Sequence, residues 1–143
     1  MASKRFLFFG VYGIMELSLH GAEGFDVQED ERFAFRHRPV DLAHLARYTM
    51  GNTVLETEVL ELFRRQMRLY YNKLRQAQDA DAWREAASVM KASARGVGAW
   101  QILLTAETAE KLAAVPGPDI RESLLTTLEA QINEADSFIQ SVL

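Results

Sequence analysis

Four long segments of the chain repeat apolar residues every three or four positions, and this spacing constrains the fold most strongly. The segments run over residues 53–77, 81–95, 99–114 and 118–141. Residues three and four positions apart lie on one face of an α-helix, whereas a half-buried β-strand alternates polar and apolar residues. No such alternation competes after residue 40. The pattern therefore predicts an all-α fold.

Polar residues and glycines predict where the first helices begin and end. Asp41 can cap a short helix over residues 42–50, which stops at Gly51. Thr53 and Glu56 form a capping-box pattern at the start of the first long segment. A short helix is therefore expected in front of the four long ones.

The later helix boundaries are separated by equally short connections. Asp79 or Asp81 can cap the second long helix, and Gly96 with Gly98 ends it. The Pro-Gly-Pro run at 116–118 separates the last two helices, and its second proline suits the first turn of a helix. Because connections this short join antiparallel neighbours, we predict an antiparallel up-down four-helix bundle with the short helix across one end.

The same periodicity assigns side chains to the core and to the surface. In the second long helix the predicted inner face consists of Trp83, Ala87, Met90 and Ala94. In the last helix it consists of Ile120, Leu124, Leu128, Ile132, Ala135 and Ile139. A polar stripe on the outer face of the second long helix then consists of Arg84, Ser88, Lys91 and Arg95.

Length and composition predict one domain with one hydrophobic core. The chain has 143 residues, of which 48% are hydrophobic. We assign residues 40–143 to the helical domain and residues 1–39 to a peripheral arm. The arm contains an apolar run over residues 6–15, but two glycines interrupt it and no signal-peptide cleavage site follows. The run is too short to span a bilayer, so a cytoplasmic protein that does not bind a membrane is expected.

Composition also argues against several kinds of site. The chain has no cysteine, so it has neither disulfides nor thiol ligands. Its histidines, His20, His37 and His44, are not spaced as helical metal ligands, and we predict no metal and no cofactor. His44 is predicted to lie at the surface or to be partly packed.

Charge is distributed unevenly along the predicted helices. Residues 53–99 contain eight basic and six acidic side chains, for a net charge of +2. Residues 100–143 contain two basic and seven acidic side chains, for a net charge of −5. Such polarity can orient an encounter with a charged protein partner. It is too weak for a nucleic-acid-binding surface, which would show a denser basic patch.

The segment from Ala87 to Ala99, ASVMKASARGVGA, resembles the signature helix of histidine phosphotransfer (HPt) domains. In that family a phospho-accepting histidine is followed by a hydrophobic pair, Lys, Gly, Ser, Ala and a closing Gly-Ala. The residues that fit are Lys91, Ser93, Ala94, Gly98 and Ala99. Ser88 stands in the place of the histidine and Ala92 in the place of the first glycine. The resemblance covers about residues 41–113.

The resemblance implies a module of bacterial two-component phosphorelay signalling that binds a response-regulator receiver domain or a histidine kinase. In the family, the lysine supplies positive charge near the phosphoryl group, and the glycine leaves room for the receiver. Two arginines of the preceding helix are expected to extend this basic surface toward the acidic pocket of a receiver. The candidate partner-binding residues are therefore Arg64, Arg68, Arg84, Ser88, Lys91, Ala92 and Arg95.

Serine at position 88 is a poor relay residue. A neutral imidazole attacks an aspartyl phosphate near neutral pH, whereas a serine hydroxyl is a poor nucleophile without an adjacent base. At three of the positions one helical turn from Ser88 the sequence has Arg84, Lys91 and Ala92, none of which is His, Asp or Glu. A serine phosphate ester would also be too stable to return its phosphoryl group to aspartate. We therefore predict a phosphotransfer-incompetent binding module with no catalytic residue and no enzymatic activity.

Two alternatives are also consistent with the sequence. The chain can be an active phosphotransfer protein that uses another residue, or one in which an original histidine has been replaced. It can also be a helical structural or adaptor protein unrelated to phosphorelay. An assay of phosphoryl transfer from a phosphorylated receiver distinguishes an active phosphotransfer protein from the binding module. A test of receiver binding distinguishes both of these from an adaptor protein unrelated to phosphorelay.

Overall fold

The computed structural model describes residues 38–143, so the prediction of a peripheral arm over residues 1–39 lies almost entirely outside the described residues. The described chain contains no β-strand and five helices, which are α3 (Leu42–Thr49), α4 (Thr53–Gln76), α5 (Ala80–Val97), α6 (Trp100–Glu110) and α7 (Pro118–Val142). The predicted all-α class is confirmed. The four long helices lie close to their predicted limits, although α6 ends at Glu110 and not near residue 114.

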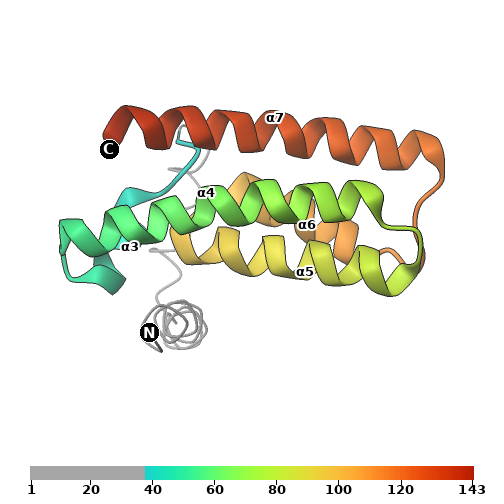
Figure 1. Cartoon of the computed structure of the whole chain (residues 1–143), viewed down its shortest axis with the longest axis horizontal. Helices are drawn as coiled ribbons and strands as arrows, with labels where there is room; N and C mark the ends of the chain where they lie inside the picture. Colours follow the sequence, from blue (N-terminus) through green and yellow to red (C-terminus); the bar gives the residue numbers. More distant parts are fainter. Residues whose placement is uncertain (1–37) are drawn as a thin grey trace, which may run out of the picture.

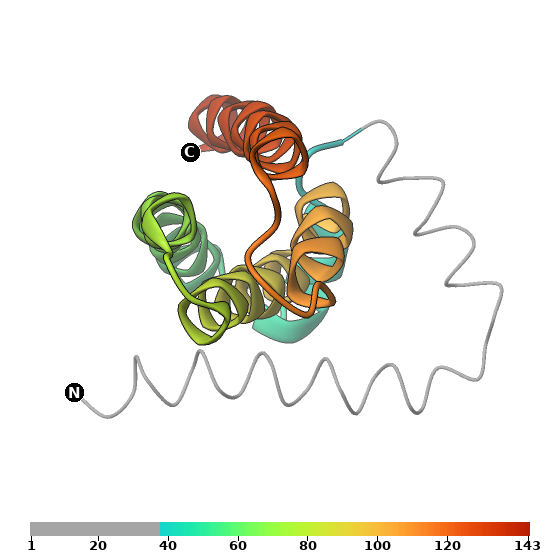
Figure 2. The same cartoon turned by 90° about the vertical axis from the view of Figure 1, so that its right-hand side faces the viewer.

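The four long helices run side by side, and each reverses the direction of the one before (Figure 1). α5 packs most extensively against α4 and α6, and α7 contacts α6 and α4. The view along the helices shows that the α4–α7 contact and the α5–α6 contact lie on opposite sides of the molecule (Figure 2). α3 packs against α4 and α5. Residues on α4 that face α7 are therefore far from residues on α5 that face α6.

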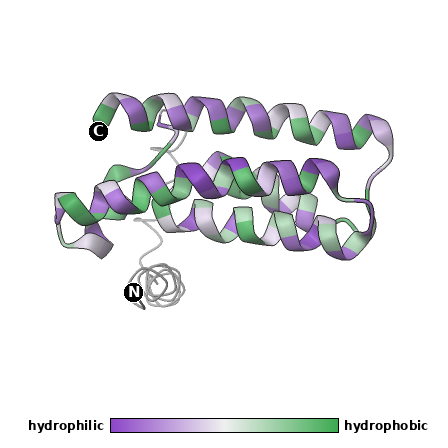
Figure 3. Ribbon diagram, in the orientation of Figure 1, coloured by the Kyte–Doolittle hydropathy of each residue, from purple (hydrophilic) through white to green (hydrophobic). Residues whose placement is uncertain are grey.

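The core forms where the apolar faces of these helices meet. Polar and apolar residues are interspersed along each helix, as expected for helices with one buried face (Figure 3). All four residues of the predicted inner face of α5 are fully buried: Trp83, Ala87, Met90 and Ala94. In α7 the prediction was wrong at Ile120, which is 58% exposed, whereas Leu124 is partly buried against the core and its neighbour Leu125 is buried more fully. Ile120 lies in the first turn of α7, where the neighbouring Arg121, and not Ile120, contacts α4 and α5.

Helix capping agrees with the prediction at α3 and α5 but not at α4. Asp41 caps α3, and Asp79, not Asp81, caps α5. The predicted capping box at Thr53 was wrong. The N-cap of α4 is Asn52, whose Oδ1 accepts a 3.1 Å hydrogen bond from the Leu55 amide. Glu56 then accepts a 2.9 Å hydrogen bond from the hydroxyl of Thr49, which ties α4 to α3.

Gly98 ends α5 and fixes how the segment before α3 approaches it. Its φ is +74°, in the left-handed region, and its carbonyl accepts a 3.1 Å hydrogen bond from the Asp41 amide. A Cβ atom added to Gly98 would lie 2.6 Å from the Cβ atom of Asp41. Gly51 has a similar φ of +75°, but a Cβ atom there would meet open space. Only Gly98 is thus required by packing as well as by its backbone angle.

Gly98→Ala is therefore expected to lower the free energy of unfolding by about 3 kcal/mol. A side chain in the left-handed region costs roughly 1–2 kcal/mol, and the clash with Asp41 adds about 1–3 kcal/mol of overpacking. Gly51→Ala shares only the backbone cost and serves as the control, with an expected loss of about 1 kcal/mol. Urea unfolding measures both values. Equal losses would show that the contact with Asp41 relaxes freely.

Candidate functional site

Ser88 lies on α5 beside the last residue of α6. Its side chain is half-buried and helps to lower the pKa of the Glu110 carboxyl group. One turn further along α5, Lys91 Nζ donates a 2.5 Å hydrogen bond to Glu110 Oε1. The Lys91 and Glu110 side chains are 20% and 22% exposed, so water reaches only part of the pair. We call these three residues the Ser88–Lys91–Glu110 cluster.

Glu110 is held in its ionised form. Burial opposes ionisation, but the hydrogen bonds from Lys91 and Ser88 and the positive charges of Lys91 and Arg95 outweigh it and lower the pKa of Glu110. The carboxylate in turn neutralises the ammonium group of Lys91 at short range. The cluster therefore places a hydroxyl and an ammonium beside one carboxylate, and the charges of the ammonium and the carboxylate cancel.

Sequence reasoning missed Glu110 because it searched only within one turn of Ser88. The structure supplies the carboxylate from the neighbouring helix. One signal was available: Ser88 and Glu110 lie almost equally far before and after the turn at Gly98. Residues placed in this way face each other when the two helices pack antiparallel. The carboxylate beside Ser88 thus comes from a residue far from it in the sequence, whereas Glu85, three positions before Ser88, was left out of that search.

The polar stripe of α5 is less exposed than predicted. The Arg84 side chain is 47% exposed and lies 3.4 Å from an Asp81 oxygen. The other three residues of the stripe are half-buried, because this part of α5 faces the edge of α6 and not open solvent. They are Ser88, Lys91 and Arg95. The α5 surface accessible to a partner is therefore formed by Arg84, the partly exposed Ala92 and the outer parts of the cluster.

The structure does not bring Arg64 and Arg68 to the Ser88 side of the molecule. Arg64 Nε donates a 2.6 Å hydrogen bond to Asp136 Oδ1, and Arg68 Nη2 donates a 3.1 Å hydrogen bond to Asp136 Oδ2. The bond from Arg64 lowers the pKa of Asp136 despite its partial burial. Both arginines therefore tie α4 to α7, opposite the α5–α6 contact (Figure 2). They do not extend the surface around Lys91.

Two small residues of the motif helix lie in the core. Ser93 and Ala94 are buried, with exposures of 2% and 0%. Among the described residues the Ser93 hydroxyl has no hydrogen-bond partner, so its role here is that of a small side chain. Small residues on this face of α5 let the neighbouring helices approach closely.

His44 is buried, so the prediction that it lies at the surface or is partly packed was wrong. It is 3% exposed, and its ring packs edge-on against the rings of Tyr48 and Trp100, with centroids 5.0 and 4.9 Å away. Burial, followed by the positive charge of Arg47, lowers the pKa of His44 to about 4, although Asp41 opposes this shift. His44 therefore serves as a neutral packing residue under the turn at Gly98.

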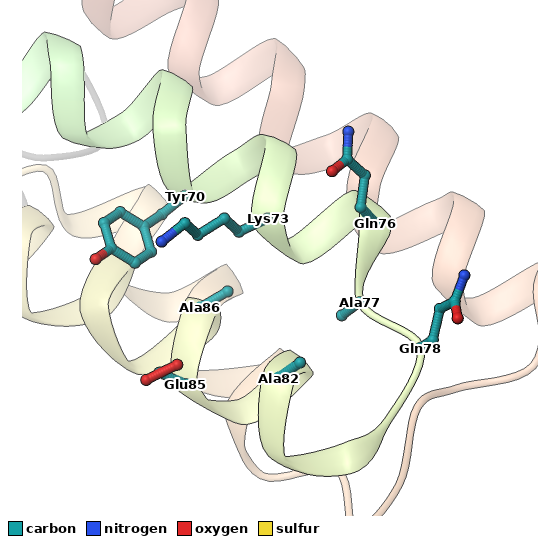
Figure 4. A pocket seen from close by; sticks show the side chains of 8 residues that line it. All are labelled: Tyr70, Lys73, Gln76, Ala77, Gln78, Ala82, Glu85 and Ala86. Atoms are coloured by element: carbon teal, nitrogen blue, oxygen red, sulfur yellow. The ribbon is translucent and has the colours of Figure 1, made fainter.

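A shallow hollow of about 370 Å³ lies between the end of α4 and the start of α5. Lys73 extends across it toward Tyr70, and its Nζ lies 4.7 Å from the centroid of that ring (Figure 4). Glu85 and small residues of α5 line the opposite wall, and the amides of Gln76 and Gln78 point away from it. The hollow is open and shares no residue with the Ser88–Lys91–Glu110 cluster.

Two further observations limit the kinds of site within residues 38–143. No helix in this range is long and apolar enough to cross a membrane. The range also contains no group of three or more His, Cys, Asp or Glu side chains placed to hold a metal ion.

Comparison of the chain with protein-family models, with curated proteins and with solved structures found no match. Its function is therefore inferred from the α5–α6 side itself.

Proposed function

We propose that the chain is a degenerate HPt-like four-helix bundle that acts as a cytoplasmic binding module in bacterial two-component signalling. It docks on a response-regulator receiver domain or a histidine kinase and carries no phosphate. One observation supports this most: on the motif helix, the place of the phospho-accepting histidine is accessible beside Lys91 but holds a hydroxyl. The alternating course of the four long helices is compatible with such a bundle.

The surroundings of Ser88 do not turn its hydroxyl into an effective acceptor. Glu110 is close enough to take a proton from Ser88, but its lowered pKa makes it a weak base. The hydrogen bond to Lys91 stabilises the carboxylate further. The stability of a serine phosphate ester, in addition, prevents return of the phosphoryl group. Position 88 therefore serves recognition and not relay.

The structure also bears on the alternative in which another residue carries the phosphoryl group. His44, the single histidine among residues 38–143, is 3% exposed and lies beneath Trp100 and Tyr48. An aspartyl phosphate on a partner cannot reach a side chain in that position without opening the packing of α3. Within the described residues, the histidine is thus unsuited to replace Ser88 as an acceptor.

Binding to purified receiver and histidine-kinase domains tests the proposal. The full chain is titrated with each domain by calorimetry, and the affinity is compared for Arg84→Glu and Arg65→Glu. Both residues are exposed, but Arg84 belongs to the α5 stripe and Arg65 to α4. We expect Arg84→Glu to weaken binding about tenfold or more, because it places like charges against an acidic partner.

Arg65→Glu makes the same change of charge elsewhere and should leave the affinity nearly unchanged. An equal loss in both variants would show that only net charge matters and that α5 is not the docking face. If no receiver or kinase domain binds the wild-type chain, the phosphorelay proposal fails. A helical adaptor protein would then be the better description.

A further inference from the structure

One face of α4 presents both apolar and charged side chains to solvent. Its residues are spaced by three or four positions and therefore share one side of the helix: Val54, Glu58, Leu62, Arg65 and Leu69. We call this set the α4 face. Val54 and Leu69 are 69% and 50% exposed. The two charged residues are also exposed, and within the described residues neither forms an ion pair. They lie about 10 Å apart along the helix, too far to pair with each other.

Two further surface features lie at opposite ends of α4 (Figure 1). Met50, in the turn between α3 and α4, is 93% exposed and has a left-handed φ of 55°. The hollow of about 370 Å³ lies at the other end, where α4 leads into α5 (Figure 4). A methionine side chain is flexible and fills irregular gaps well. About 36 Å of helix separates Met50 from the hollow, so the two can meet only between two copies of the chain.

We propose that the α4 face binds the same face of a second copy, in an antiparallel dimer whose two-fold axis passes Leu62. A two-fold axis makes each contact occur twice, with the roles of the two copies exchanged. A residue that precedes Leu62 by some number of positions then lies level with the partner's residue that follows it by the same number. Met50 comes level with the partner's Leu74. Both neighbours of that position on the α4 side of the hollow, Lys73 and Ala77, line the hollow, which Met50 enters.

The same register also pairs the charged and the apolar residues of the α4 face. Glu58 comes level with Gln66 and so lies beside the partner's Arg65, and symmetry makes this ion pair twice. Val54 comes level with Tyr70, beside the partner's exposed Leu69. A parallel dimer would instead place Glu58 against Glu58 and Arg65 against Arg65, and such like-charge contacts are costly. The antiparallel arrangement is thus the one that satisfies all of these side chains.

The size of the surface fits a stable dimer. α4 is 24 residues long, which corresponds to about 36 Å, and with α5 beside it forms a layer about 20 Å wide (Figure 1). Each copy therefore offers about 700 Å², close to the roughly 800 Å² per partner of a standard interface. This inference does not rest on the proposed function. Arg84 belongs neither to the α4 face nor to the hollow, so loss of the dimer leaves that residue available to a receiver.

Analytical ultracentrifugation of the full chain tests the dimer, and we expect the wild type to sediment as a dimer at micromolar concentration. Met50→Glu should raise the dissociation constant about tenfold or more, because it brings a carboxylate into the hollow beside Glu85. Leu104→Glu makes the same kind of change at a 49% exposed residue of α6 and should leave the dissociation constant unchanged. Thermal unfolding of each variant reports whether it is folded.

Reversal of the charges tests the register. Glu58→Arg and Arg65→Glu each bring like charges together and should weaken the dimer about tenfold. The double variant with both substitutions restores opposite charges and should return the dissociation constant close to that of the wild type, a rescue that a folding defect cannot produce. The proposal is overturned if the wild type stays monomeric up to millimolar concentration, or if Met50→Glu leaves the dimer unchanged. It is equally overturned if the double variant dimerises no more tightly than the single ones.

Discussion

Replacing Trp83 with alanine is expected to lower the free energy of unfolding by about 4 kcal/mol, as for other fully buried tryptophans. The Trp83 side chain is 0% exposed, and among the described residues it is the largest side chain that is fully buried. Its Nε1 donates a 2.8 Å hydrogen bond to the Ala109 carbonyl, which joins α5 to α6. The Arg121 guanidinium of α7 lies 5.3 Å from its ring centroid. This side chain thus joins α5 to both α6 and α7, and its loss leaves a cavity among the three helices.

Two further variants separate the contributions of Trp83. Trp83→Phe keeps an aromatic ring but removes the Nε1 donor, and because the Ala109 carbonyl still accepts a 3.3 Å hydrogen bond from the Leu112 amide, the expected loss is about 1 kcal/mol. Trp100→Ala removes the other tryptophan, which is only half-buried, and should cost less than half as much as Trp83→Ala. Urea unfolding of the three variants provides the values. Similar losses for Trp83→Ala and Trp100→Ala would contradict the central position assigned to Trp83.

Ser88→His is expected to convert a chain that takes no acid-labile phosphate into one that takes some. An imidazole at position 88 would lie next to Lys91 and Glu110, and a neutral ring nitrogen attacks the phosphorus of an aspartyl phosphate. The phosphorus–nitrogen bond forms as the aspartate carboxylate leaves. Because Ser88 is half-buried, the larger ring should cost about 1 kcal/mol in stability, at the lower end of overpacking.

The measurement is the transfer of labelled phosphate from a phosphorylated receiver, with acid treatment to distinguish phosphohistidine from an acid-stable serine phosphate. Ser88→Ala is the control for the wild type and should behave like it. Acid-stable label on the wild type that disappears in Ser88→Ala would show that Glu110 activates the serine, and the binding-only proposal would be wrong. A folded, receiver-binding Ser88→His variant that takes no label would direct attention to Ala92, which adds a methyl group where the family has glycine.

The helix-forming pattern was readable because it is local. Four helices were placed from apolar spacing, and Asp41, Gly98 and Pro118 lie at the helix ends where capping and backbone preferences put them. The failures at Thr53 and Ile120 are also local in origin. Asn52, one residue earlier, is the better cap, and the apolar period of α7 continues into a first turn in which Ile120 stays exposed.

The positions of the candidate residues were predicted in part, and their role in binding stays a prediction. Position 88, Lys91 and Ala92 were found from the order of residues in one helix, and the inner face of that helix was predicted in full. Glu110 was not found, and Arg64 and Arg68 were assigned to a surface that the structure places on the other side of the molecule. These errors share one cause: a sequence pattern fixes which face of a helix is apolar, but not which polar groups of another helix lie against it.

By itself the sequence determined the class of the fold, the position of each helix and the apolar face that each one buries, since these follow from residue spacing within single helices. The tertiary structure decided which charges meet. Antiparallel packing around the turn at Gly98 brings Glu110 to Ser88 and Lys91, and contact between α4 and α7 brings Asp136 to Arg64. Such pairs depend on the register between helices, which is set by how side chains of different size pack together. The same packing buries His44 and leaves Ser88 within reach of a partner.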